Sequence, residues 1–197
     1  MRDRFLSHAF EENVPFQLAA AQFGANKPLH VLFPYSQRLI AFADWHRQLL
    51  AESLGKTSEV GLTPIVALGA TDQHSQLQLY SDGPDDKFFM FMGVDDLGPD
   101  LAIPVSDDPS VAYLEGVTFG QLLQTEMNGT IRALTEKCRP LLTISVPRVD
   151  EATLGALFML FECSVAFLGE FYGINAFDQP GVERSKLLTK AFLNSRS

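Results

Sequence analysis

Side chains that could do chemistry gather near the end of the chain, in the ten residues from Phe177 to Lys186, F-D-Q-P-G-V-E-R-S-K. A Pro-Gly break leads there into a polar helix start, where Asp178 can cap the helix and Pro180 suits its first turn. Gln179 then lies at the first turn and Lys186 about two turns further along. Free backbone amides at such a helix start attract anions, so this pattern can bind an anionic group. An ordinary capped surface helix is the simpler interpretation of these residues alone.

A second pair of polar side chains lies on a helix predicted over 37–54, which ends at Gly55 and Lys56. Gln48 and Glu52 are four residues apart, so they share one helix face. Taken alone, the pair is typical of a solvated helix flank.

His74 is the histidine whose position favours chemistry. It lies in G-A-T-D-Q-H-S-Q, at the start of a helix directly after a predicted strand, where doubly wound sheets place ligand groups. Imidazole titrates near neutral pH, which suits proton delivery. His30 falls within a strand and His46 on a helix, and both are interpreted as structural or surface groups.

The elements that must position these residues alternate between strand and helix. Apolar runs predict strands over 29–33, 63–69, 87–94 and 141–146, and helical periodicity predicts helices over 15–23, 37–54, 72–82, 118–138, 152–172 and 180–194. The stretch 95–113 is rich in Asp, Pro and Gly and is expected to be a long exposed excursion. This order predicts a doubly wound α/β domain, with a mainly parallel sheet covered by helices on both faces. We expect one domain over 15–197, preceded by a connector over 1–14.

Composition excludes some classes of partner. The chain has 197 residues, of which 46% are hydrophobic and 20% charged, and a formal net charge of −9. It therefore shows no electrostatic footprint for nucleic acid or for an anionic membrane. A phosphorylated substrate is itself negatively charged, so it would need a local binding site that overcomes repulsion by the negative net charge of the chain.

Cys138 and Cys163 lie far apart beside apolar runs, which favours reduced, buried thiols in a cytoplasmic protein. The first ten residues lack an apolar signal core, so secretion is not expected. The segment 152–172 is apolar enough to raise the question of a membrane span. Glu162 and Glu170 within it favour a core helix or a subunit contact instead.

Three of these motifs together resemble the glucose-6-phosphate isomerase family. The last motif matches the family signature F-D-Q-x-G-V-E-x-x-K, the segment from Gln48 to Lys56 matches Q-x-x-x-E-S-x-G-K, and His74 follows a glutamine at the matching place. The resemblance runs from about Pro15 to the last residue. It implies a sugar-isomerase (SIS) type of three-layer α/β/α fold.

The resemblance also implies roles for the matching residues. Glu52 would move a proton between C1 and C2 of glucose 6-phosphate or fructose 6-phosphate through an enediol. His74 and Lys186 would assist ring opening, while Gln48 and Gln179 would contact the sugar phosphate. Neither a metal nor an organic cofactor is implied.

Only the second SIS domain of such an enzyme is recognisable in this sequence. The serine- and threonine-rich phosphate loops and the arginine of the family's first half have no counterpart here, so the chain is expected to be inactive without an N-terminal SIS domain. One alternative is a non-catalytic sugar-phosphate-binding or regulatory SIS module, which would have no use for the base Glu52. Another is an interaction module that binds through the apolar helix over 152–172.

Helix directions predict how the site is assembled. Glu52 is near the end of its helix, at the edge of the sheet where strands begin, and His74 is at a helix start on the opposite edge. A helix of this length separates the two edges by on the order of 25 Å. We therefore expect a homodimer in which Glu52 of one subunit and His74 of the other share one active site.

Overall fold

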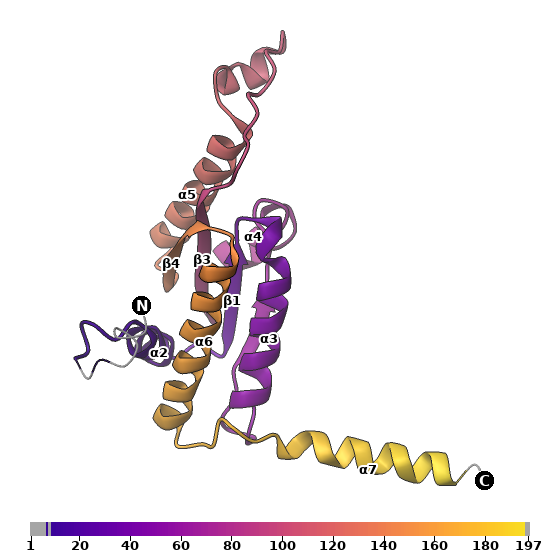
Figure 1. Ribbon diagram of the computed structural model, residues 1–197. Coiled ribbons are helices and arrows are strands. Elements are labelled where there is room, and N and C mark those ends of the chain that lie inside the picture. Colours follow the sequence, from indigo (N-terminus) through magenta and orange to yellow (C-terminus); the bar gives the residue numbers. More distant parts are fainter. Residues whose placement is uncertain (1–6, 8, 196–197) are drawn as a thin grey trace.

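The computed structural model describes Ser7 and residues 9–195. Its elements, with the labels of Figure 1, are α2 Val14–Ala25, β1 Leu29–Pro34, η1 Gln37–Leu39, α3 Ile40–Leu54, β2 Thr63–Val66, α4 Gln73–Asp82, β3 Lys87–Asp96, η2 Pro109–Leu114, α5 Phe119–Glu136, β4 Leu141–Arg148, α6 Glu151–Tyr172 and α7 Pro180–Asn194. Half of the predicted connector over 1–14 lies outside the described residues. The boundary between connector and domain therefore stays a prediction.

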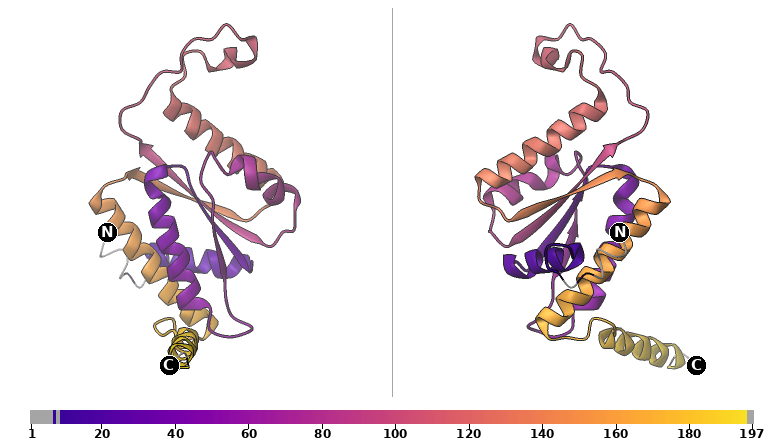
Figure 2. Two further views of the ribbon diagram at one scale, coloured as in Figure 1. Left: turned by 90° about the vertical axis from the view of Figure 1, so that its right-hand side faces the viewer. Right: turned by 60° about the vertical axis from the view of Figure 1, so that its left-hand side comes forward.

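The four strands form one parallel sheet in the order β2-β1-β3-β4. Helices α4 and α5 cover one face, while α2, α3 and α6 cover the other (Figures 1 and 2). This confirms the predicted doubly wound α/β class. It also places the start of every helix that follows a strand at the carboxyl edge of the sheet.

The two central strands explain why both faces are covered. β1 and β3 are nearly continuous apolar runs, so alternate side chains enter two different cores. Leu32 and Met90 pack toward α3 and α6, whereas Phe33 and Phe91 stack toward α4 and α5 with ring centroids 5.2 Å apart. A third apolar cluster joins α2, α3 and α6 near the amino edge.

Several predicted boundaries need correction. The helix expected over 37–54 is split, because its first turn is the 3-10 helix η1 and the α-helical ladder begins only at Ile40. β4 was expected to close at Pro147 but continues to Arg148. It tolerates Pro147 because β4 is an edge strand and needs no hydrogen-bond donor on its outer side.

Two segments project from the body of the molecule. The predicted excursion leaves the end of β3 and returns to α5 as a long arm, closed near its base by an antiparallel bridge between Ala102 and Thr118 (Figures 1 and 2). α7 leaves the opposite end of the molecule and extends outward as a single helix. The first projection confirms the sequence prediction of an exposed excursion.

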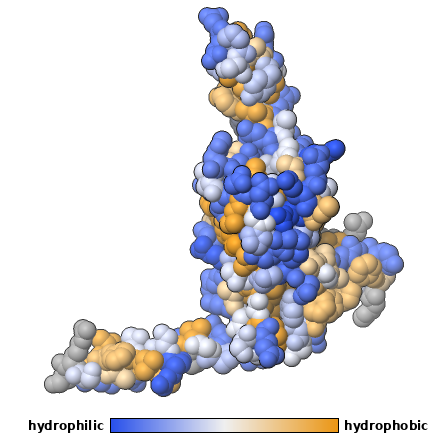
Figure 3. Space-filling model, turned by 180° about the vertical axis from the view of Figure 1, so that it is seen from behind, coloured by the Kyte–Doolittle hydropathy of each residue, from blue (hydrophilic) through white to orange (hydrophobic). Residues whose placement is uncertain are grey.

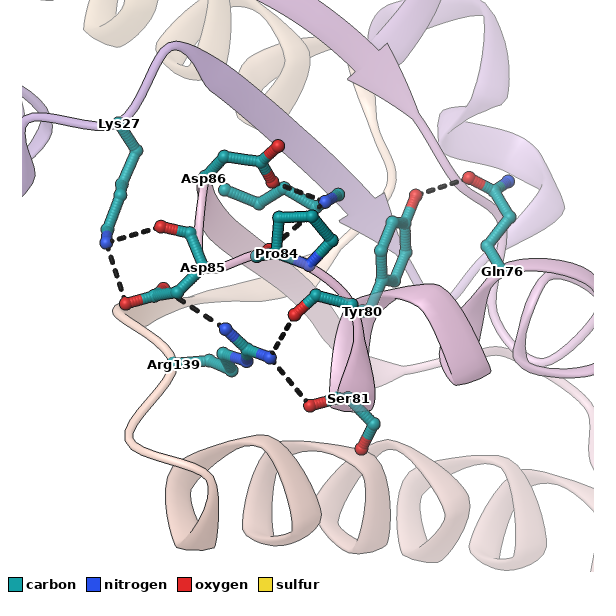
Figure 4. A network of polar contacts seen from close by, with 10 residues as sticks. Lys27, Gln76, Tyr80, Ser81, Pro84, Asp85, Asp86 and Arg139 are labelled. Atoms are coloured by element: carbon teal, nitrogen blue, oxygen red, sulfur yellow. Dashed lines mark hydrogen bonds and ion pairs between the residues drawn. The ribbon is translucent and has the colours of Figure 1, made fainter.

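Arg139 fastens α4 to the start of β3 (Figure 4). Its guanidinium donates to the backbone oxygens of Ser81 at 2.8 Å and Gly83 at 2.6 Å, and lies 3.4 Å from the Asp85 carboxylate. Lys27 pairs with the same carboxylate at 2.8 Å. These contacts satisfy carbonyl groups at the end of α4 that the helix itself leaves open.

The expectation of two buried thiols is wrong for Cys138. Its side chain is exposed and its backbone is in the left-handed region, with φ 55°, because the chain turns sharply between α5 and β4. Cys163 is half-buried on α6, and burial raises the pKa of its thiol. Both cysteines are free.

α6 has the length and hydropathy of a membrane span, and 39% of its most apolar window is buried inside the protein. Its buried residues, among them Leu157, Phe161 and Leu168, pack against α2, α3 and β4. The rest of this apolar window is not buried within the chain. The structure therefore leaves both expectations open, a core helix and a helix that contacts another subunit or partner.

A buried polar network lies among α2, β1 and α6. The Ser164 hydroxyl donates to Gln22 Oε1 at 3.2 Å, and Gln22 Nε2 donates to His30 Nδ1 at 3.1 Å. His46 is buried against the ring of Phe161, with centroids 4.6 Å apart. Burial lowers the pKa of His30 to about 4 and that of His46 to about 3. Both histidines are therefore neutral in the folded protein at neutral pH.

These two histidines predict an acid-sensitive fold. An unfolded histidine takes up a proton near pH 6.5, whereas the folded ones do so only near pH 3 to 4, so stability is lost as the pH falls below 6.5. From pH 7 to pH 5 we expect the free energy of unfolding to fall by about 2 kcal/mol for each histidine. Denaturant titrations at the two pH values measure this. His46→Phe should halve the loss, and equal stability at both pH values would contradict the assignment.

Candidate functional site

The exposed carboxylate of Glu52 lies in the last turn of α3, at the amino edge of the sheet. Gln48 Nε2 donates to Glu52 Oε1 at 3.3 Å, so the structure brings these two predicted site residues together on one helix face. Solvent can reach the Glu52 carboxylate from outside the helix. It could accept a proton from a substrate held over this end of α3.

Lys56 links the end of α3 to the start of α7. Its ammonium donates to the backbone oxygen of Glu52 at 2.9 Å and pairs with the Asp178 carboxylate at 3.2 Å, and it also donates to the backbone oxygen of Asp178. The Lys56 side chain is only 7% exposed. This lysine was part of the matched motif but was not predicted as a site residue. The motif itself is the signal that could have identified it.

The start of α7 differs in detail from the prediction. Gln179 occupies the N-cap position without a capping hydrogen bond from its side chain, and Pro180 is the first helical residue, as expected. Asp178 does not cap the helix, because its carboxylate accepts from Asn175 Nδ2 at 3.0 Å and pairs with Lys56. The contacts of Lys56 with Glu52 and Asp178 nevertheless hold Gln179 at the same end of the molecule as Glu52.

Lys186 lies near the middle of α7. Seven residues of helix separate it from Gln179, which corresponds to about 10 Å along a helix that leads away from the body. Apolar side chains are also exposed along α7, including Leu187, Phe192 and Leu193 (Figure 3). Within this chain, α7 therefore does not enclose Lys186 and Glu52 in one pocket.

His74 lies at the opposite edge of the sheet. Its exposed side chain is in the first turn of α4, where Gln73 Nε2 donates to the Tyr35 hydroxyl at 2.7 Å. Burial acts to raise the pKa of Asp72, but hydrogen bonds, the strongest from Ser75 and from the Leu68 amide, hold it below its ordinary value. These contacts fix the turn that presents His74.

α3 begins with Ile40 at the carboxyl edge, where His74 also lies, and Glu52 follows 12 residues later, a rise of about 18 Å. The two side chains therefore do not meet within one chain. This follows from the direction of the helices. It is the arrangement from which the sequence predicted a site shared between subunits.

A hollow of about 240 Å³ opens at the carboxyl ends of β1 and β3, close to Tyr35. Strand connections diverge at this point of the sheet, where open α/β folds commonly bind ligands. Its wall includes the Asp95 carboxylate, whose two oxygens accept from Ser145 Oγ at 3.0 Å. A negative charge here disfavours a phosphate group. Among the described residues, no cluster of three or more His, Cys, Asp or Glu could hold a metal ion.

Comparison with known proteins identifies similar sequences. Residues 123–197 match the sequence model of the family described as phosphoglucose isomerase. The glucose-6-phosphate isomerase of Carboxydothermus hydrogenoformans is 44% identical over 85% of this chain and 38% of its own length. A glucose-6-phosphate isomerase of Thermus thermophilus is 39% identical over 91% of this chain and 45% of its own length. This chain therefore spans less than half the length of these relatives.

Solved structures share the fold. A crystal structure of a hypothetical protein from Thermus thermophilus superposes with a TM-score of 0.91 at 37% identity, over 97% of this chain and 47% of that one. A glucose-6-phosphate isomerase from Chlamydia trachomatis superposes with a TM-score of 0.83 at 22% identity, over 98% of this chain and 41% of that one. The second likeness concerns the fold alone.

The ion pair between Lys56 and Asp178 is predicted to hold the segment that leads into α7. Lys56→Met removes the ammonium that holds Asp178, so residues 174–179 should exchange their amide hydrogens at least several-fold faster while the sheet stays protected. Hydrogen exchange with mass spectrometry measures both regions. Lys190→Met, a change of the same kind on exposed α7, is the control and should leave residues 174–179 unaffected. Unchanged exchange at residues 174–179 in Lys56→Met would show that other contacts hold the start of α7.

Proposed function

We propose that this chain, which is similar to glucose-6-phosphate isomerases over part of their length, belongs to that family and forms the C-terminal SIS domain of an enzyme that interconverts glucose 6-phosphate and fructose 6-phosphate. The observation that carries this proposal is the exposed Glu52 carboxylate beside the Gln48 amide, tied through Lys56 to the segment that presents Gln179. This arrangement places a proton acceptor among hydrogen-bonding groups suited to a polyhydroxylated substrate. The enzyme would serve glycolysis and gluconeogenesis in the cytoplasm.

The proposed reaction moves protons without external electrons. Glu52 takes the proton from C2 of the open-chain aldose and delivers it to C1, while the hydroxyl proton passes from O2 to O1 through the enediol. The carbonyl carbon at C1 is reduced as C2 is oxidised, so the redox change is internal to the sugar. Negative charge develops on oxygen during this transfer, and a positioned donor or cation must stabilise it.

The remaining groups act on the substrate before and around this step. His74 and Lys186 assist opening of the sugar ring by moving a proton to or from the ring oxygen, while Gln48 and Gln179 hold the sugar phosphate. The phosphate site and the group that stabilises the enediolate come from an N-terminal SIS domain. This division explains why the hollow beside Tyr35, with Asp95 in its wall, is poorly suited to a phosphate.

A homodimer completes the site. Glu52 and His74 lie at opposite edges of one sheet, so Glu52 of one subunit would work with His74 of the other. α7 leaves the body with apolar side chains exposed, which is consistent with a helix that packs against another surface.

The alternative is a non-catalytic SIS module that binds sugar phosphates for regulation. Such a module needs a phosphate cradle and has no use for a general base. The hollow at the carboxyl edge carries a carboxylate, and the base is present at the other edge. Both observations favour the isomerase.

Replacing Glu52 tests the catalytic proposal. A chimera would join this chain to the part of the Thermus thermophilus relative that the chain does not match. We expect it to convert fructose 6-phosphate in a coupled assay, and Glu52→Gln should lower kcat by about 100-fold to 10,000-fold, because a general base contributes this much. Glu59→Gln, which removes a carboxylate from the loop after α3, should retain activity. Full activity in Glu52→Gln would exclude the proposed base.

Mixing two inactive variants tests the shared site. Glu52→Gln and His74→Gln chimeras, each inactive or nearly so, should recover activity when their subunits are exchanged, because one site of each mixed dimer then contains both native residues. Random exchange makes half of the dimers mixed, so we expect roughly a quarter of the native activity, a consequence of two-fold symmetry. The purified variants before mixing provide the baseline. If exchange is verified by mass and no activity returns, Glu52 and His74 of different subunits do not share a site.

A further inference from the structure

β4 forms one open edge of the sheet. It pairs with β3 on one side, and within the described residues no strand pairs with its other side. Such an edge presents unpaired backbone groups that can accept another strand. The opposite edge strand, β2, has only four residues, whereas β4 has eight.

The register identifies which backbone groups of β4 are free. The Phe89 amide donates to the backbone oxygen of Pro140 at 3.1 Å, and Phe89 lies opposite Leu141. In a parallel ladder this pattern repeats every two residues, so Leu141, Thr143 and Ser145 direct their N–H and C=O groups away from β3. Pro147 continues the same series and has no N–H, which limits a strand at this edge to the stretch before it.

An apolar cleft of about 390 Å³ runs along this free edge. β4 forms one wall, α6 contributes Leu160, and α2 forms the other wall with four residues. The lining consists of Val14, Gln17, Leu18, Ala21, Leu142, Thr143, Ile144 and Leu160. Among these, the amide of Gln17 is occupied, because it donates to the backbone oxygen of Phe10 at 2.7 Å. The remaining surface is mainly hydrocarbon, which offers little to a sugar or a phosphate.

We propose that the edge of β4 and this cleft together dock a β-strand from the half of the enzyme that this chain does not span. The strand would pair with the backbone between Leu141 and Ser145. Its alternate side chains would be apolar and would fill the cleft between α2 and β4. The added strand would extend the sheet from four strands to five and would cover the exposed backbone of its edge.

The size of the relatives and the position of the cleft favour this occupant. This chain spans 38% of the Carboxydothermus enzyme and 47% of the aligned Thermus crystal structure, so more than half of each relative lies outside the matched region and could supply such a strand. The polypeptide enters the fold at Val14, which itself lines the cleft. The start of α2 therefore lies beside the open edge.

A second copy of this chain fits the cleft less well. In a symmetric contact the same surface meets itself, so each cleft would have to be filled by side chains of the same edge. Those side chains, Leu142 and Ile144, already form the wall of their own cleft. A strand from another part of the enzyme can instead present a complementary row of side chains.

This inference rests on the proposed function only for the origin of the strand, and hydrogen exchange tests it without any turnover. Peptides covering 141–146 should exchange at least tenfold more slowly in the chimera described above than in this chain alone. Ala21→Glu places a charge in the cleft at an exposed position and should remove most of this slowing. Gly24→Glu adds the same charge to the same helix, where a side chain has open space, and should preserve the slowing.

A second variant removes a backbone hydrogen-bond donor of β4. Thr143→Pro removes an outward N–H at a position equivalent to that of Pro147, so pairing with β3 should persist while the slowing at 141–146 is lost. Equal exchange in the chimera and in the chain alone would overturn the proposal. Slowing in the chain alone that increases with protein concentration would also overturn it, in favour of a second copy. If the Glu52→Gln chimera is inactive but its residues 141–146 still exchange slowly, strand docking does not depend on catalysis.

Discussion

The direction of each helix relative to the parallel sheet is the constraint on which the rest of the structure depends. A right-handed crossover obliges the chain to leave a strand at the carboxyl edge and to return along a helix to the amino edge. α3 therefore carries Glu52 to the amino edge, while α4 begins with His74 at the carboxyl edge. The division of the candidate site into two halves follows from this topology. A local rearrangement of side chains cannot remove it.

Much of the fold could be predicted from the sequence because local and tertiary preferences agree there. The apolar runs of β1 and β3 are buried on both faces, and α2 and α6 end at Asn26 and Gly173, two residue types that readily adopt the left-handed conformation seen there. Prediction failed where tertiary position decides the outcome. Cys138 lies beside an apolar run but is turned outward by the sharp connection into β4, and Pro147 is tolerated only because β4 is an edge strand.

The candidate site was predictable to the extent that its residues are neighbours along one helix. Spacing alone places Gln48 and Glu52 on one face, and the structure gives them a hydrogen bond. The contact between Lys56 and Asp178 joins residues 122 positions apart. Sequence periodicity relates only residues that are close in the chain, so it cannot predict such a pair. It also explains why Asp178 is not the helix cap: its carboxylate is attracted to a nearly buried ammonium, which outweighs the gain from capping an exposed helix.

The chain's folding and its proposed chemistry have different requirements, and the structure meets only the first by itself. Three apolar clusters fill the space between sheet and helices, which is the burial that a stable domain needs. The groups suited to chemistry lie at the periphery, on an exposed helix end, at an exposed helix start and along a projecting helix. Proton transfer beside a carbonyl requires a site that excludes water and provides a fixed counter-charge. Exposed side chains acquire such surroundings only when further polypeptide covers them, so a stable core and an incomplete active site are compatible in one chain.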